Sequence, residues 1–350
     1  MKMKMLKILS AALIIMSLAS VSFAEDKDIT DFTEDTRVFK IDSSIQVRKA
    51  HFHNIYGIDL TGDLYLPKDF DSSKKYAAIA VAGPFGAVKE QVSGLYAQEM
   101  AKFGYVALAF DPSFTGESGG PARNVSSPEI NTEDFSAAVD FLSTRDFIDP
   151  ERIGIIGVCG WGGIGLNAAA SDTRIKATVS STMYNLSRVA ANGYFDADDS
   201  EEKRFAARQA MNAQRVKDYK SGTYARAGGV IDPLPEDAPQ FVKDYHAYYK
   251  TPRGYHKRSL NSNEGWNVTA GLALINMPML AFVSEIRSPV LIIHGEKAHS
   301  RYLGEDTFKL LKGDNKELVI IPGASHVDLY DNMEKIPFEK IKTFFDTYLK

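Results

Sequence analysis

The single cysteine of this 350-residue chain lies where an apolar run turns abruptly glycine-rich. Residues 155–158 have the composition of a buried strand, Cys159 follows them, and residues 160–163 hold three glycines before an alanine-rich helical stretch. A strand, a sharp corner and a helix can hold a nucleophilic side chain at the edge of a sheet, with the next N–H beside it. This pattern predicts that Cys159 is a catalytic nucleophile rather than a small buried side chain.

Apolar runs recur along the chain in a rhythm of strands and helices. The expected strands are residues 45–52, 58–66, 76–82, 105–110, 153–158, 175–180, 290–294 and 317–321. The expected helices include residues 95–103, 132–144, 164–170 and 337–349. The first two strands alternate in polarity and indicate an antiparallel pair, whereas the others are continuous apolar runs. Strands that alternate with helices predict a mainly parallel sheet with helices on both faces.

A long interruption separates the sixth and seventh expected strands, at about residues 186–285. It is polar and largely helical in pattern, and it holds seven of the sixteen tyrosines of the chain. We interpret it as a mostly helical cap that covers a pocket at the end of the sheet.

The first 24 residues have the parts of an export signal. Three lysines precede an apolar stretch at residues 8–19, and small residues follow at 22–24. The apolar stretch is too short to span a membrane. The sequence therefore predicts a signal peptide at residues 1–24 and a mature domain at residues 25–350. This protein would be secreted or periplasmic, without stable membrane insertion after cleavage.

The charge balance and the motifs exclude several classes of function. The formal net charge is −4, and removal of three signal-peptide lysines takes it to −7, so there is no basic footprint for nucleic acid. No cluster of His, Cys and Asp has metal-ligand spacing, and no glycine-rich loop has the lysine of a phosphate-binding motif. We expect no metal and no cofactor, and a small-molecule acyl substrate.

A thiol nucleophile needs a base. His326 lies in the loop after the last expected strand and is the best candidate, and His299 is the main rival. The orienting acid is less obvious, because Ala298 stands where a carboxylate is expected after the seventh strand. Glu296 is the preferred acid. Glu305, Asp306 or no acid at all are the alternatives.

An oxyanion hole needs two N–H donors directed at the developing charge. Gly160, immediately after the cysteine, is expected to supply one. The loop at residues 83–86, after an expected strand, would supply the other. Pro84 has no N–H, so Phe85 is the predicted donor.

Together these segments resemble the dienelactone hydrolase-like branch of the α/β-hydrolase superfamily. The resemblance rests on the Gly-Val-Cys-Gly corner at residues 157–160, on Ser325–His326, and on residues 83–91 and 251–256. It implies an α/β-hydrolase fold with a mainly parallel central sheet and a cap between strands 6 and 7. Trp161 stands where that branch usually has a small residue, and we expect it to wall the pocket.

The resemblance also implies a function. It is hydrolysis of a small ester or lactone through an acyl-enzyme, with Cys159 as nucleophile, His326 as base and Glu296 as acid. A peptidase on the same fold and a ligand-binding protein without turnover are the alternatives. An acyltransferase would use the same residues if an acceptor other than water took the acyl group.

Overall fold

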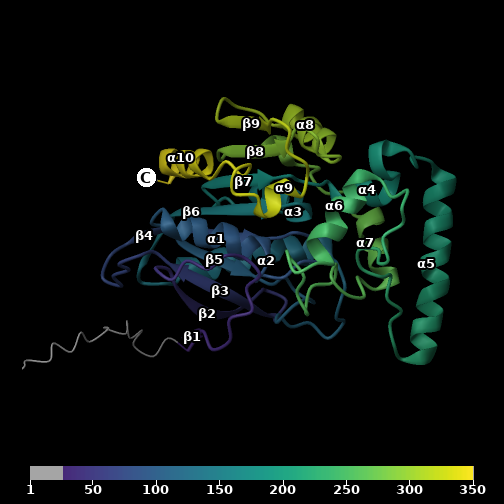
Figure 1. Ribbon diagram of the computed structural model, residues 1–350, viewed down its shortest axis with the longest axis horizontal. Helices are drawn as coiled ribbons and strands as arrows, with labels where there is room; N and C mark the ends of the chain where they lie inside the picture. Colours follow the sequence, from purple (N-terminus) through teal and green to yellow (C-terminus); the bar gives the residue numbers. More distant parts are fainter. Residues whose placement is uncertain (1–26, 350) are drawn as a thin grey trace, which may run out of the picture.

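The computed structural model describes residues 27–349, and the predicted signal peptide lies outside them. A nine-stranded sheet in the order β1-β2-β3-β5-β4-β6-β7-β8-β9 forms its centre (Figure 1). The strands are β1 (Ile29–Asp31), β2 (Gln46–His53), β3 (Asp59–Leu66), β4 (Tyr76–Ala82), β5 (Val106–Phe110), β6 (Ile148–Val158), β7 (Ala177–Ser181), β8 (Val290–Gly295) and β9 (Lys316–Ile321). The five pairings from β5 to β9 are parallel and the three before them antiparallel. The predicted mainly parallel sheet is confirmed, with β1 as an additional short edge strand.

Helices pack on both faces of this sheet. They are α1 (Val92–Lys102), α2 (Pro128–Ser143), α3 (Gly160–Ser171) and α10 (Phe338–Tyr348). Side chains of a strand alternate between faces. Ile79 and Val81 of β4 therefore pack with α1 and α10, whereas Ala78 and Ala80 pack with α2 and α3. Two apolar cores result, one on each side of the central strands.

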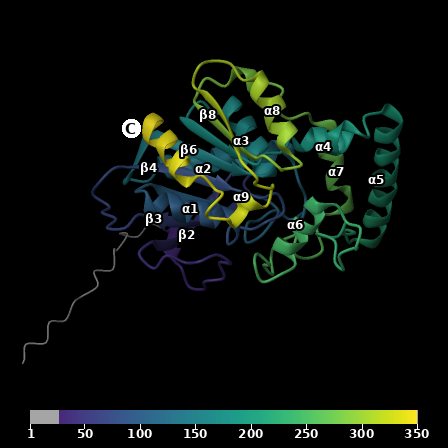
Figure 2. The ribbon, with the colours of Figure 1, turned by 45° about the horizontal axis from the view of Figure 1, so that its top comes forward.

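The chain between β7 and β8 forms a separate group of helices. These are α4 (Leu186–Asn192), α5 (Glu201–Ser221), α6 (Gln240–Tyr249) and α7 (Gly271–Asn276), with short 3₁₀ turns η1 (Tyr194–Asp196), η2 (Val268–Ala270) and η3 (Val283–Glu285). Figures 1 and 2 show the four α-helices at one end of the sheet, with α5 outermost. We call residues 186–285 the cap. Two further helices, α8 (Arg301–Leu310) and α9 (Asp328–Asp331), follow β8 and β9.

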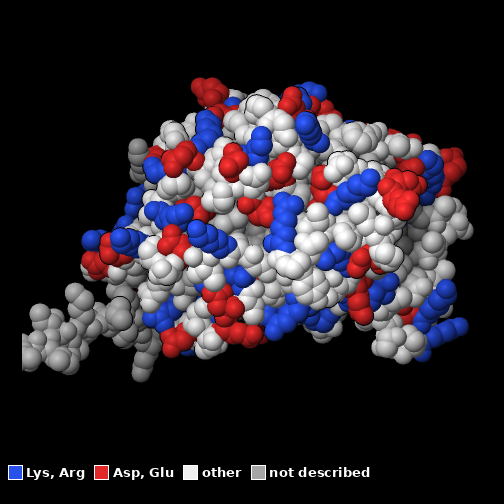
Figure 3. Space-filling model, viewed as in Figure 1, with Lys and Arg blue, Asp and Glu red and all other residues white. Residues whose placement is uncertain are grey.

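Charges of both signs are interspersed over the face shown in Figure 3. Within residues 27–349, no helix is both long and apolar enough to cross a membrane.

Candidate active site

Cys159 occupies the sharp turn between β6 and α3. Its φ of +60° lies in a region that side chains other than glycine seldom adopt. The turn closes tightly because its neighbours are small. A Cβ on Gly157 would lie 2.0 Å from the carbonyl oxygen of Trp161, and one on Gly163 would lie 2.0 Å from that of Tyr184. The glycine-rich sequence is thus what allows the chain to turn here.

The side chain of Trp161 does not line the cavity that contains Cys159, which is described below. Its ring packs edge-on against Phe110, with centroids 5.9 Å apart, and against Phe135, with centroids 5.5 Å apart. It is almost fully buried in the core formed with α2 and α3. The prediction that Trp161 walls the pocket is therefore wrong.

Four groups lie near the sulfur of Cys159 and lower the pKa of its thiol. They are the hydroxyls of Tyr330 and Tyr245 and the backbone N–H groups of Phe85 and Gly160. Burial raises the pKa of the thiol, and these donors partly oppose that effect because they favour the thiolate. The loop of Phe85 lies close, since a Cβ on Gly160 would be 2.7 Å from the Cβ of Phe85. The two predicted oxyanion donors therefore lie together beside the sulfur.

His326 reaches the sulfur through a tyrosine. Its Nε2 lies 3.2 Å from the hydroxyl of Tyr330, and this hydroxyl also lies near the sulfur of Cys159. Its Nδ1 lies 2.7 Å from the hydroxyl of Ser300 and 2.8 Å from that of Thr182. Across the part of the chain that the structure describes, no hydrogen bond joins the imidazole directly to the sulfur. The predicted base is present, with Tyr330 between it and the thiol.

The predicted acid is not brought to the imidazole. Glu296 is exposed, and its Oε2 accepts a hydrogen bond from the backbone N–H of Gly323 at 2.7 Å. The carboxylates of Glu305 and Asp306 pair with arginine side chains. The role expected of Glu296 is corrected by this geometry, because hydroxyl groups and not a carboxylate hold Nδ1 of His326.

The second histidine, His299, also connects to the sulfur. Its Nε2 is hydrogen-bonded to the hydroxyl of Tyr184, which lies 2.9 Å from the hydroxyl of Tyr245. Tyr245 in turn lies near the sulfur of Cys159. We call these six residues the thiol cluster: Cys159, Tyr184, Tyr245, His299, His326 and Tyr330.

The groups of the thiol cluster are uncharged at neutral pH. Burial lowers the pKa of His299 to about 4 and, with the neighbouring histidines, holds the pKa of His326 well below its ordinary value. Burial also raises the pKa of the three tyrosine hydroxyls well above their ordinary value. The tyrosines therefore keep their hydroxyl protons, and burial keeps both imidazoles neutral.

A second buried cluster lies behind the loop of Phe85, and it is ionic. The ammonium group of Lys89 lies 2.6 Å from Glu117, 2.8 Å from Glu90 and 3.0 Å from Asp111. Arg258, from the cap, also pairs with Glu90. We call these five residues the lysine cluster. Asp111 additionally accepts a hydrogen bond from the backbone N–H of Lys89 at 2.8 Å, which ties the cluster to the oxyanion loop.

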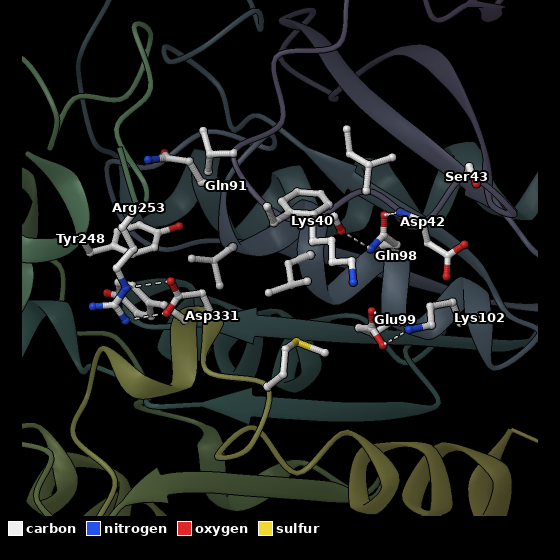
Figure 4. A pocket seen from close by; sticks show the side chains of 17 residues that line it. Lys40, Asp42, Ser43, Gln91, Gln98, Glu99, Lys102, Tyr248, Arg253 and Asp331 are labelled. Carbon is white, nitrogen blue, oxygen red and sulfur yellow. Dashed lines mark hydrogen bonds and ion pairs between the residues drawn. The ribbon is translucent and has the colours of Figure 1, made fainter. Parts of the chain in front are cut away.

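Two cavities adjoin these residues. The one that contains Cys159 has a volume of about 270 Å³ and lies between the sheet and the cap. A larger one, of about 640 Å³, is lined by the ion pairs Arg253–Asp331 and Lys102–Glu99 (Figure 4) and does not include the cysteine. Tyr330 borders both. The smaller cavity is therefore the candidate site of chemistry.

Among residues 27–349, no group of three His, Cys, Asp or Glu side chains is placed to hold a metal ion. The functional groups that the sequence did not indicate are hydroxyls, those of Thr182, Tyr184, Tyr245, Ser300 and Tyr330. The sequence offers one sign of them. Tyr330 follows His326 by four residues, a spacing that places two side chains on the same side of a helical turn.

The fold and the position of the site define the class of protein. A mainly parallel sheet, helices on both faces and a buried nucleophile after a central strand are features of an α/β-hydrolase. The α/β-hydrolase GrgF from Penicillium sp. sh18 superposes with a TM-score of 0.72. It covers 87% of this chain and 99% of that chain at 19% identity, which is a likeness of fold.

The sequence comparisons give the family. Residues 61–187 match the model of the dienelactone hydrolase family. The uncharacterized protein PA2218 of Pseudomonas aeruginosa is 52% identical over 314 residues, which are 89% of this chain and 84% of that protein. Its crystal structure superposes with a TM-score of 0.87 and covers 91% of this chain and 99% of that chain, at 51% identity. The chain belongs to the dienelactone hydrolase family and is an α/β-hydrolase enzyme, as the resemblance predicted.

One similar protein has a more specific name. The thiohydrolase aneE of Aspergillus aculeatus is 37% identical over 132 residues, which are 38% of this chain and 40% of that protein.

Proposed function

We propose that this enzyme hydrolyses the acyl bond of a small ester, lactone or thioester, with Cys159 as nucleophile and His326 as base. The observation that carries the proposal is the hydroxyl of Tyr330, which lies near the sulfur and 3.2 Å from Nε2 of His326. The similarity to a thiohydrolase supports a thioester among the substrates.

Proton transfer begins from the neutral cluster. Nδ1–H of His326 donates to the hydroxyl of Ser300 or Thr182, so that Nε2 accepts from the hydroxyl of Tyr330. As the sulfur attacks, its proton passes to the oxygen of Tyr330 while the phenolic proton passes to Nε2. The products of this step are a thiolate and an imidazolium, and Tyr330 is unchanged.

Acylation then follows. The thiolate of Cys159 forms a bond to the carbonyl carbon, and the carbonyl oxygen becomes an oxyanion that accepts from the N–H groups of Phe85 and Gly160. Collapse of this intermediate breaks the bond to the leaving group, which takes the proton of the imidazolium by the reverse route through Tyr330. A water molecule attacks the acyl-thioenzyme in the same manner and returns its proton to the thiolate.

The absence of a carboxylate partner at His326, within the described chain, is compatible with this chemistry. A thiol is more acidic than a serine hydroxyl and needs a less basic imidazole. The hydroxyls of Ser300 and Thr182 still orient the ring, because both lie within hydrogen-bond distance of Nδ1.

The experiment compares the native enzyme with Cys159→Ala on a panel of p-nitrophenyl esters and acyl thioesters. We expect kcat/KM to fall at least about 10³-fold in Cys159→Ala. We also expect His326→Ala, mixed with substrate, to gain the mass of one acyl group, which disappears when Cys159 is also replaced. Equal rates in the native and Cys159→Ala proteins would refute the nucleophile. Negligible rates in both, without an adduct, would favour a ligand-binding protein without turnover.

A further inference from the structure

The cavity beside Cys159 differs from its surroundings in having no charged wall. Of the described residues, none that lines it is Asp, Glu, Lys, Arg or His. Part of its wall is aliphatic. Leu186, Val189 and Ala190 of α4, Leu274 of α7 and the intervening Val230 form this part.

The polar atoms of the cavity are gathered near the sulfur and bond to one another. The hydroxyl of Tyr184 contacts those of Tyr245 and Tyr194 at 2.9 and 3.4 Å. The side-chain amide of Asn261 donates to the carbonyl oxygen of Phe85 at 2.7 Å. These partners are used within the protein, so the aliphatic end offers a bound group little beyond apolar contact.

Three arginines of the cap are engaged elsewhere. Arg188 pairs with Asp196 and Asp306, and Arg258 pairs with Glu90. Arg253 pairs with Asp331 at the other cavity. An anionic group at the aliphatic end would therefore be buried without a counter-charge, which is strongly unfavourable.

We infer that the acyl group of the substrate is uncharged and aliphatic, of medium chain length, and that it lies against α4 and α7. The inference rests on the proposed function and specifies its substrate class. A volume of about 270 Å³ holds roughly nine groups the size of water, at about 30 Å³ each, which corresponds to an acyl chain of about six to ten carbons. Acyl groups that end in a carboxylate would be rejected.

The first experiment measures kcat/KM for p-nitrophenyl esters from two to fourteen carbons, alongside esters of equal length that end in a carboxylate. We expect a rise of roughly threefold to fourfold per methylene, a maximum near eight carbons, and at least about 100-fold discrimination against the carboxylate. A profile that does not depend on length, or a preference for the carboxylate, would overturn the inference while leaving the Cys159 mechanism intact.

Two substitutions of valine by arginine provide a matched pair. Val189 lines the cavity, whereas Val216 lies on the exposed side of α5 and is 54% exposed. Val189→Arg is expected to reduce the preference for neutral esters at least tenfold, and Val216→Arg is expected to leave it unchanged. Equal effects of the two changes would contradict the assignment. Val189→Phe, which keeps the wall apolar, should shift the maximum to shorter chains.

A binding experiment tests the same inference independently of turnover. Iodoacetamide can alkylate only one cysteine in this chain, and intact mass reports the extent. Octanamide is expected to slow alkylation of Cys159, whereas suberic acid monoamide, of equal length with a terminal carboxylate, is not. If protection shows this pattern and no ester is turned over, the substrate class stands and the proposed hydrolysis fails. Equal protection, or none from either ligand, would refute the substrate class.

Discussion

The thiol cluster and the lysine cluster join the same two parts of the molecule, yet one is composed of neutral groups and the other of acidic and basic side chains. Both connect the sheet domain to the cap, through Tyr245 in one case and Arg258 in the other. The thiol cluster is built from neutral donors and acceptors, and the lysine cluster from acidic side chains paired with basic ones. The neutral groups hold protons that can be transferred between them, whereas buried paired charges resist rearrangement. We therefore assign chemistry to the first cluster and the position of the oxyanion loop to the second.

The largest expected effect separates the two imidazoles of the thiol cluster. His326 reaches the sulfur through one tyrosine and His299 through two. We expect His326→Ala to lower kcat by about 10³-fold, in the range typical of a lost general base, and His299→Ala to lower it less than tenfold. Steady-state kinetics on one ester measures both. Equal losses of kcat in the two variants would mean that His299 contributes to proton transfer as much as His326 does.

The next largest effect is expected from a substitution that disrupts the lysine cluster. Lys89→Met leaves the carboxylate of Asp111 buried without its ammonium partner and Glu90 with Arg258, and we expect a loss of about 3–5 kcal/mol in the free energy of unfolding. Denaturant titration measures it. Lys203→Met, which removes a surface pair with Asp198, is the control and should change stability little.

Activity distinguishes the roles of the clusters in the same variant. At a temperature where Lys89→Met is folded, kcat should fall less than tenfold, because Lys89 does not contact the sulfur. A loss of activity comparable to that of His326→Ala, without loss of stability, would mean that Lys89 takes part in catalysis. The assignment of catalysis to the thiol cluster alone would then be wrong.

A smaller effect on kcat is expected when one hydroxyl group is removed. Tyr330→Phe keeps the ring and removes the group between Cys159 and His326, and we expect kcat to fall about 10- to 100-fold. Tyr248→Phe is the matched control, since Tyr248 is also a buried tyrosine but borders only the other cavity (Figure 4). Unchanged kcat in Tyr330→Phe would mean that the imidazole acts on the sulfur without this tyrosine.

The features of the fold and of the site that could be predicted are those set by residues close together in the sequence. The parallel strands could be read from the sequence because buried strands are continuous apolar runs, whereas three residues of β1 carry no such pattern. Cys159, Gly160 and Phe85 could be predicted because each follows the end of a strand, and strand ends converge at one edge of the sheet.

The hydroxyl groups could not be predicted in this way. Tyr245 lies on a cap helix far along the chain from Cys159, and the spacing of Tyr330 from His326 is the one local sign of these groups. The prediction for Glu296 failed for a different reason. Its spacing placed it in the correct loop, but spacing does not specify which way a side chain points, and here it points to Gly323.

The smallest effect concerns pH, where the two clusters oppose each other. Burial lowers the pKa of His299 to about 4 and that of the adjacent His294 to about 3. Below the ordinary histidine value of about 6.5, the unfolded chain therefore binds more protons than the folded one, so these groups reduce stability as the pH falls. Burial, together with Asp111, raises the pKa of Glu90. The folded state then binds the extra proton, so this carboxyl increases stability as the pH falls toward its ordinary value.

The free energy of unfolding of the native enzyme should therefore fall between pH 6.5 and 5, because the histidines outnumber the one carboxyl that offsets them in part. Glu90→Gln removes the compensating group, and we expect its free energy of unfolding to fall more steeply on acidification, by about 1 kcal/mol per pH unit. Urea titrations at several pH values measure the slope, which is independent of any constant loss that the substitution causes. An unchanged slope would show that Glu90 is ionised throughout this pH range. The lysine cluster would then contribute nothing to the pH dependence of stability, which would come from the histidines.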